Sequence, residues 1–162
     1  MNAIVSVTAD WGIGMDGRLL VRNPADMRFF RNTTMGGTVI CGRTTFLSFP
    51  GGALKGRRNV VLSRDRSFTA KGALVVHSTK EANEAIRDED PNSVWLIGGE
   101  SVYEALLPCC DRAYVTMNDT RLPADAWFPN LDKSDRWTLE QVESGGVTQS
   151  GVPYEFRTYL RI

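Results

Sequence analysis

The stretch SVWLIGGES, residues 93–101, carries the pattern that decides the fold. Its first half is a short, continuously apolar run, which is typical of a strand buried on both faces of a sheet. Two glycines follow, and they open a helical pattern that ends before Pro108. A buried strand that leads directly into a helix is the repeating unit of a parallel sheet covered by helices.

The same pattern recurs along the chain. Strands are predicted at residues 2–8, 38–41, 59–63, 73–76, 93–97 and 112–117. Helices are predicted at residues 24–34, from Gly42 to the break at Pro50, from the capping box at Ser78 to about Asp88, and after Gly99. The last two strands, near 137–143 and 154–161, are joined by a glycine-rich loop at 145–151. We therefore predict an α/β fold over residues 1–162: a single domain with a mostly parallel central sheet of about eight strands, helices on both faces, and a C-terminal antiparallel hairpin.

The segment between the first strand and the first helix is unusually long. Within it, residues 12–17 read G-x-G-x-x-G, but no helix begins inside that motif, so the usual dinucleotide-binding interpretation is disfavoured. A loop of about 15 residues is often a lid or binding loop, and a plain surface loop is equally compatible with the sequence.

Composition excludes several function classes. Nineteen basic residues balance nineteen acidic ones, so no overall field favours nucleic acid or an anionic membrane. One histidine and three cysteines without a C-x-x-C pair leave little for a metal site or a histidine-based triad, and general acid chemistry falls to Asp or Glu. No signal peptide and no apolar run of about 20 residues is visible. We expect a cytoplasmic protein with no metal, a small-molecule substrate and, by default, a monomeric state.

Two strand-to-helix turns point to a nucleotide. Gly42 to Thr45 and Gly98 to Ser101 each place free backbone N–H groups at the start of a helix, where an anion binds. Either turn alone is more commonly a plain connection, but two at one sheet edge suit the two ends of a dinucleotide. Arg43, Arg64 and His77 add basic groups that favour the 2′-phosphate of NADPH, although each alone is also compatible with a solvated side chain.

Asp26 is the candidate acid. It stands in the first turn of the helix that begins at Pro24, where a carboxylate commonly serves only to answer the helix dipole. Phe30, four residues later, lies on the same helix face. A carboxylate beside an aromatic ring is partly desolvated and can accept two parallel hydrogen bonds from a flat, amidine-like edge.

Taken in order, these motifs resemble dihydrofolate reductases of the bacterial chromosomal type. The resemblance rests on the following pieces: residues 13–15, 24–27 with Phe30, 39–45, 54–63, 97–103 and 114–116. Each is weak alone, whereas the ordered set from about residue 4 to 117 is specific.

The resemblance implies NADPH-dependent reduction of 7,8-dihydrofolate to tetrahydrofolate, with Asp26 as the catalytic acid and antifolates as inhibitors. The implied substrate-binding residues are Ile4, Val5, Asp26, Met27, Phe30, Phe49, Leu54, Arg57, Ile97, Tyr103 and Thr116. The implied cofactor-binding residues are Ser6, Ile13, Gly14, Leu19, Gly42, Arg43, Thr44, Thr45, Leu62, Ser63, Arg64, His77, Gly98, Gly99, Glu100, Ser101, Val102 and Tyr103. A cis peptide between Gly98 and Gly99 and a first loop that acts as a lid are implied as well.

Three sites depart from the family pattern, and one of them is Gly51-Gly52, which makes the substrate-side loop roomier and looser. Leu20-Val21 stands where bacterial members usually carry Pro-Trp, whose tryptophan packs at the pocket and anchors an ordered water. Ser101 stands where a basic residue often helps to bind the cofactor. Two other functions remain open: a reductase of the riboflavin pathway on the same fold, and a catalytically silent module that binds NADPH or folate.

Overall fold

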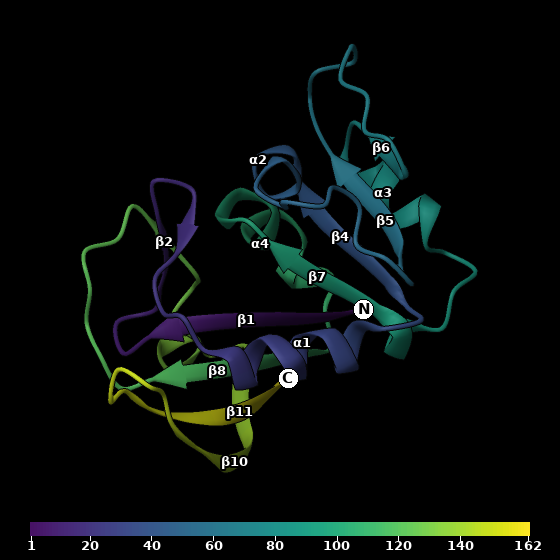
Figure 1. The fold of residues 1–162 in the computed structure, drawn as a ribbon. Helices are drawn as coiled ribbons and strands as arrows, with labels where there is room; N and C mark the ends of the chain where they lie inside the picture. Colours follow the sequence, from purple (N-terminus) through teal and green to yellow (C-terminus); the bar gives the residue numbers. More distant parts are fainter.

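The computed structural model describes residues 1–162 and is organised around one eight-stranded sheet (Figure 1), with strand order β10-β11-β8-β1-β7-β4-β5-β6. Its strands are β1 (Asn2–Thr8), β4 (Thr38–Gly42), β5 (Arg58–Leu62), β6 (Ala73–Val76), β7 (Val94–Gly98), β8 (Arg112–Asn118), β10 (Trp137–Val147) and β11 (Pro153–Arg161). All pairs from β8 to β6 are parallel, and β11 is antiparallel to both β8 and β10. The predicted fold class and closing hairpin are confirmed.

Helices cover both faces of the sheet. They are α1 (Pro24–Thr34), α2 (Arg43–Leu47), α3 (Thr79–Ala85) and α4 (Glu100–Leu106), with short 3-10 turns η1 (Pro91–Ser93), η2 (Leu107–Cys109) and η3 (Leu131–Lys133). Val39 faces α1 and Cys41 faces α2, whereas Ile40 between them joins the cluster under α3 and α4. Because side chains alternate along a strand, α1 and α2 share one face and α3 and α4 the other.

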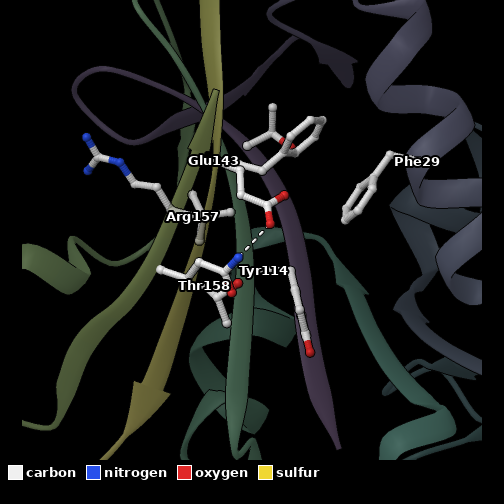
Figure 2. A pocket seen from close by; sticks show the side chains of 9 residues that line it. Phe29, Tyr114, Glu143, Arg157 and Thr158 are labelled. Carbon is white, nitrogen blue, oxygen red and sulfur yellow. Dashed lines mark hydrogen bonds between the residues drawn. The ribbon is translucent and has the colours of Figure 1, made fainter. Parts of the chain in front are cut away.

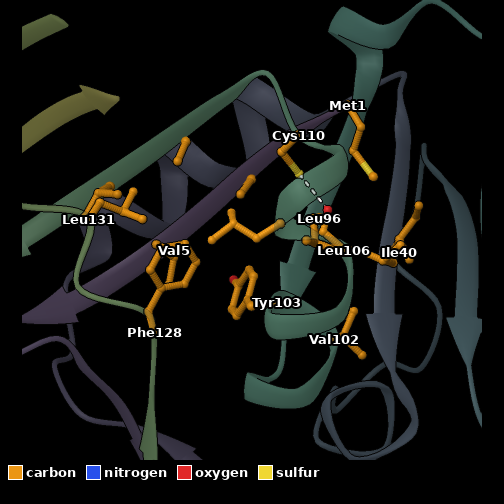
Figure 3. Close-up of a cluster of buried hydrophobic side chains, with 14 of the residues drawn as sticks. Met1, Val5, Ile40, Leu96, Val102, Tyr103, Leu106, Cys110, Phe128 and Leu131 are labelled. Carbon is orange, nitrogen blue, oxygen red and sulfur yellow. Dashed lines mark hydrogen bonds between the residues drawn. The ribbon is translucent and has the colours of Figure 1, made fainter. Parts of the chain in front are cut away.

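The larger core lies on the α4 side (Figure 3). Tyr103 of α4 is 3% exposed, and its ring meets that of Phe128 edge-on at 4.8 Å. Its hydroxyl donates to the Ile4 carbonyl at 2.7 Å. This bond satisfies a buried polar group and fixes α4 against β1.

Residues 9–23 are more ordered than the predicted loop. β2 (Gly12–Met15), β3 (Arg18–Leu19) and β9 (Ala126–Trp127) form a second, three-stranded sheet in the order β3-β2-β9. The sequence gives little sign of β9, because a two-residue strand has no periodicity.

Two predicted boundaries also shift. β10 extends through Gly145-Gly146, which were expected in a loop. Glycine is needed at position 145 of this strand, because a Cβ there would collide with the Tyr154 ring. α3 ends at Ala85 rather than near Asp88, and Arg58 Nη1 donates to the Ala85 carbonyl at 2.7 Å, so a side chain satisfies this helix end.

The three cysteines are free. Cys41 and Cys110 are buried, and burial raises the pKa of both thiols to about 12. Cys109 is exposed, at the edge of the sheet where β8 begins. None of the helices has both the length and the apolar character needed to cross a membrane.

Candidate active site

The N-terminus of α1 lies over the carboxyl ends of β1 and β8. Asn23 caps the helix: its Oδ1 accepts from the Asp26 amide at 3.2 Å, and Pro24 occupies the first helical position. The parallel register sets Ser6 of β1 beside Thr116 of β8. The predicted helix start therefore brings Asp26 onto two strand-borne hydroxyl groups.

Asp26 is held by hydroxyls rather than by a cation. Thr116 Oγ1 donates to Asp26 Oδ1 at 2.6 Å. Burial raises the pKa of Asp26 above its ordinary value, and the hydroxyls of Thr116 and Ser6 offset part of that rise. No salt bridge forms at this carboxylate, which leaves its second oxygen for a ligand.

A group of apolar side chains, here called the apolar slot, lies on the same face of the sheet as the carboxylate. Phe30, Leu54 and Ile97 pack against buried Ile4 in one cluster, and Phe49 joins Ile97 in the neighbouring cluster. These predicted substrate residues therefore lie together, although α1, β1, β7 and the segment between α2 and β5 contribute them separately.

Two predicted substrate side chains lie elsewhere. Val5 belongs to the core cluster on the α4 side, so its side chain points away from the apolar slot. Tyr103 lies in that cluster too, with its hydroxyl occupied by Ile4. Met27 is 60% exposed, at the rim of α1.

Arg57 lies toward the other end of α1. Its Nε donates to the Lys55 carbonyl at 3.1 Å and its Nη1 to Thr34 Oγ1 at 3.1 Å. Desolvation lowers the pKa of Arg57, and the nearby charge of Arg31 lowers it further. The guanidinium has a fixed orientation but no counter-ion, which is what a carboxylate-binding arginine requires.

The two glycine turns face each other. A Cβ on Gly42 would approach Val102 Cγ2 to 3.0 Å and the Gly99 amide nitrogen to 4.0 Å, and a Cβ on Gly99 would approach Thr45 Oγ1 to 3.2 Å. No side chain caps α2 or α4, so the first amides of both helices are unsatisfied within the helix. The peptide between Gly98 and Gly99 is cis, as the resemblance implies.

The basic residues beside these turns differ in their partners. Arg43 pairs with Asp65 at 3.5 Å and stacks on Phe68 at 5.3 Å, so its guanidinium already has one acidic and one aromatic partner. His77 Nδ1 lies 2.8 Å from the carbonyl oxygen of Ser63, which ties the ends of β5 and β6 together. Arg64 is exposed and forms no ion pair.

The remaining predicted cofactor residues divide by exposure. Leu19 is 70% exposed, and Ser101 and Thr44 are exposed; Ile13 and Val102 are buried, and Leu62 and Ser6 are half-buried. The structure thus spreads this group between the surface and the core.

The first loop is fastened to a segment that the sequence did not single out. Gly14 accepts from the Asp125 amide at 2.9 Å, and Asp125 Oδ2 accepts from the Asp16 amide at 3.0 Å. Glu100 Oε1 accepts from the Trp127 amide at 3.2 Å, which links the same segment to α4. The two contacts of Asp125 join residues more than 100 positions apart, and no local pattern reveals them.

Phe29 and Phe30 face different spaces. Phe29 packs on Phe156 at 4.7 Å, and both rings line a cavity of about 180 Å³ between α1 and the closing hairpin, which Thr116 also lines. Figure 2 shows Glu143 directed into this cavity and the Arg157 guanidinium turned away from it. Arg157 instead pairs with Asp132 and Glu155.

The fold and the site together define the class: an α/β protein with a half-buried acid beside an apolar slot and two facing glycine turns at the neighbouring strand ends. The sequence model of the family "Dihydrofolate reductase" matches residues 1–161. This chain belongs to the dihydrofolate reductase family, which confirms the resemblance found in the sequence.

Individual relatives agree. The dihydrofolate reductase of Mycobacterium tuberculosis is 41% identical over 154 residues, which cover 92% of this chain and 90% of that protein. That of Staphylococcus haemolyticus is 33% identical over 164 residues, with 100% and 96% covered. A solved structure of dihydrofolate reductase from Enterococcus faecalis, complexed with NADP(H) and RAB-propyl, has a TM-score of 0.89 at 30% identity and covers 99% of this chain and 95% of that one.

Proposed function

We propose that this protein reduces 7,8-dihydrofolate to 5,6,7,8-tetrahydrofolate with NADPH. One hydride and one proton are added across the imine bond of the pterin, and NADP⁺ is released. The observation that carries the proposal is the Asp26–Thr116 pair beside an apolar slot, because it offers a flat heterocycle one carboxylate in a partly desolvated setting.

Asp26 has two tasks in this proposal. Its oxygens accept from the amino group and the adjacent ring N–H of the pterin, which fixes the ring in the slot. Its raised pKa brings the carboxyl closer to the pH at which a group can both hold and release a proton, and it thereby assists protonation of the imine nitrogen. Thr116 keeps the carboxylate in one orientation.

Arg57 binds the other end of the substrate. Its guanidinium, oriented by Thr34 and the Lys55 carbonyl, clamps the α-carboxylate of the glutamate tail through two parallel hydrogen bonds. The apolar slot between Asp26 and Arg57 takes the pterin and aminobenzoyl rings.

The cofactor binds across the facing turns. When bound there, NADPH supplies the hydride. Gly42 and Gly99 allow the two turns to approach each other closely, and the free amides of α2 and α4 suit the pyrophosphate. Arg64, which has no acidic partner, binds the 2′-phosphate, with His77 beside it. The loop that carries Ile13, Gly14 and Leu19 closes over the nicotinamide.

The free thiols support a cytoplasmic location, because unpaired cysteines suit a reducing compartment.

The test is an absorbance assay of NADPH oxidation, run with and without dihydrofolate and repeated with NADH. We expect oxidation that depends on dihydrofolate and is faster with NADPH. Turnover of a pyrimidine ribityl substrate instead would favour the riboflavin-pathway reductase. Tight binding of NADPH and dihydrofolate without any turnover would identify a silent binding module.

A further inference from the structure

A group of polar side chains surrounds Asp26 on the α1 face of the sheet. The register of β1 and β8 sets Ser6 beside Thr116 and Thr8 beside Asn118, so the ends of both strands present hydroxyl and amide groups to the start of α1. Asn118 is fully buried and Asn23, which caps α1, is 3% exposed.

Asn118 is hydrogen-bonded through one side of its amide only. Its Nδ2 donates to Ser6 Oγ at 3.0 Å and to the Val7 carbonyl at 2.8 Å, and these two acceptors fix the orientation of the amide. Its Oδ1 is buried and has no protein partner. Ser6 lies beside Thr116 in the register of β1 and β8, and Thr116 donates to Asp26 Oδ1, so the bond to Ser6 places Asn118 close to the carboxylate.

In Asn23 the amide oxygen is hydrogen-bonded and the amide nitrogen is not. Its Oδ1 accepts from the Asp26 amide, which fixes the orientation, and its Nδ2 is buried without a protein partner. These are the two buried side-chain polar atoms of the whole chain that lack one, and both belong to residues in direct contact with Asp26 or with Ser6.

The chemistry of these two atoms identifies their ligand. A buried polar atom left unpaired costs about 1–3 kcal/mol, so both atoms call for partners. One is a donor and the other an acceptor. A cation could not satisfy the amide N–H, and an anion could not satisfy the amide oxygen, whereas water donates and accepts and characteristically bridges such groups.

We propose that Asn23 and Asn118 hold ordered water that hydrogen-bonds to the Ser6–Asp26 pair, and that through this water they act as positioning residues for the carboxylate. The inference rests on the proposed reduction of dihydrofolate. The water fixes the orientation of the carboxylate and donates to it, and it gives the half-buried acid a hydrogen-bonded route by which a proton taken up by the substrate is replaced from solvent.

The groups that bear on Asp26 can be named element by element. Asn23 belongs to the start of α1, Ser6 to β1 and Thr116 to β8. The arginines of α1, Arg28 and Arg31, are exposed and form no ion pair with Asp26. A change in the titration of Asp26 therefore reports on neutral hydrogen-bond partners.

Two substitutions test the water site directly. Asn118→Leu removes both halves of one amide, and Asn23→Ser keeps an oxygen for the helix cap while it removes the unpaired N–H group. We expect kcat to fall roughly two- to tenfold in each, which corresponds to the loss of one net hydrogen bond, with less than a twofold change in the KM for dihydrofolate. The midpoint of the Asp26 carboxyl, followed by ¹³C NMR, should move to higher pH, because the carboxylate loses a donor.

Ser78→Ala is the matched control. Ser78 caps α3 as Asn23 caps α1, far from the slot, so it should lower the melting temperature without moving the Asp26 midpoint or kcat. If Asn118→Leu fails to fold, Asn118→Ser takes its place.

Diffraction at high resolution supplies the direct observation. Crystals of the unchanged protein should show water within hydrogen-bond distance of Asn23 Nδ2 and Asn118 Oδ1, and that water should be lost in the Asn118 variant. The absence of water density at both atoms, or a titration midpoint of Asp26 that is the same in all variants, would overturn the inference. An unchanged protein that does not oxidise NADPH with dihydrofolate would instead overturn the proposed function, and the NMR and diffraction readouts would still decide on the water site.

Discussion

Asp26 and Arg57 lie at opposite ends of one helix and are held in opposite senses. At the start of α1, a threonine hydroxyl donates to the Asp26 carboxylate; at its end, the hydroxyl of Thr34 accepts from the Arg57 guanidinium. Burial raises the pKa of the acid, and desolvation together with Arg31 lowers that of the base. For both groups the charged form is therefore less favourable in the protein than it would be in water.

The comparison shows how a site can keep two opposite charges available. Neither group has a counter-ion in the protein, and each is oriented by a neutral hydroxyl. Asp26 and Thr34, the α1 residue that Arg57 contacts, are eight positions apart, which is about 12 Å at 1.5 Å per residue, so the two charged groups do not pair with each other. A ligand with a donor edge at one end and a carboxylate at the other satisfies both.

The largest effect is expected at the acid. Asp26→Asn should lower dihydrofolate reduction at pH 7 by roughly 10²–10⁴-fold, because the group that assists protonation is lost. Activity should recover partly at acidic pH, where the substrate is protonated in solution. Steady-state kinetics across pH measure this, and near-normal turnover at pH 7 would contradict the role.

At the basic end the effect should fall on binding. Arg57→Ala should weaken dihydrofolate binding roughly 10–100-fold and leave NADPH binding within twofold, because only the tail carboxylate loses its partner. Arg58→Ala is the control, since this neighbouring arginine pairs with Glu89 and should affect stability alone. Equal loss of both ligands in the Arg57 variant would point to misfolding.

The two hydroxyls separate orientation from charge. Thr116→Val should raise the pKa of Asp26 further, since the carboxylate loses its donor, and should lower kcat roughly tenfold. Thr34→Val should raise the KM for dihydrofolate severalfold with little change in kcat. A pH–rate profile for each variant makes the comparison; identical profiles and equal KM changes would contradict the division of roles.

The smallest effect concerns stability. Because the folded pKa of Asp26 lies above its unfolded value, the folded state binds more protons in that interval, and stability falls as pH rises through it. Asp26→Asn should therefore stabilise the protein at pH 7, which a higher melting temperature would show. The gain should shrink in thermal melts below the ordinary carboxyl pKa, where both variants are neutral.

Local patterns were enough to predict most of this architecture. The apolar strands, the helix start at Asn23-Pro24 and the glycine turns each depend on neighbouring residues, so their periodicity and capping chemistry are visible in the sequence. The placement of Asp26 next to Thr116 was implied only by the resemblance, because the two residues are 90 positions apart.

The features that escaped prediction depend on tertiary contacts. The small sheet forms because Asp125 and Trp127 meet the first loop, and neither residue stands in a recognisable local pattern. Val5 is among the substrate-binding residues that the resemblance implies, and strand alternation directs its side chain into the core on the α4 side. Asn118 lies in an otherwise ordinary strand, and only the register of β1 and β8 reveals its connection with the acid.

The unequal burial of the three thiols allows one of them to be labelled selectively. Alkylation requires a thiolate, and burial keeps Cys41 and Cys110 protonated as well as inaccessible. A maleimide dye or a surface tether should therefore attach at Cys109 alone, where β8 begins, whereas the acid and the glycine turns lie at the opposite ends of the strands. The unaltered sequence thus supplies its own attachment point for single-molecule or immobilised measurements, on the side of the sheet away from the slot.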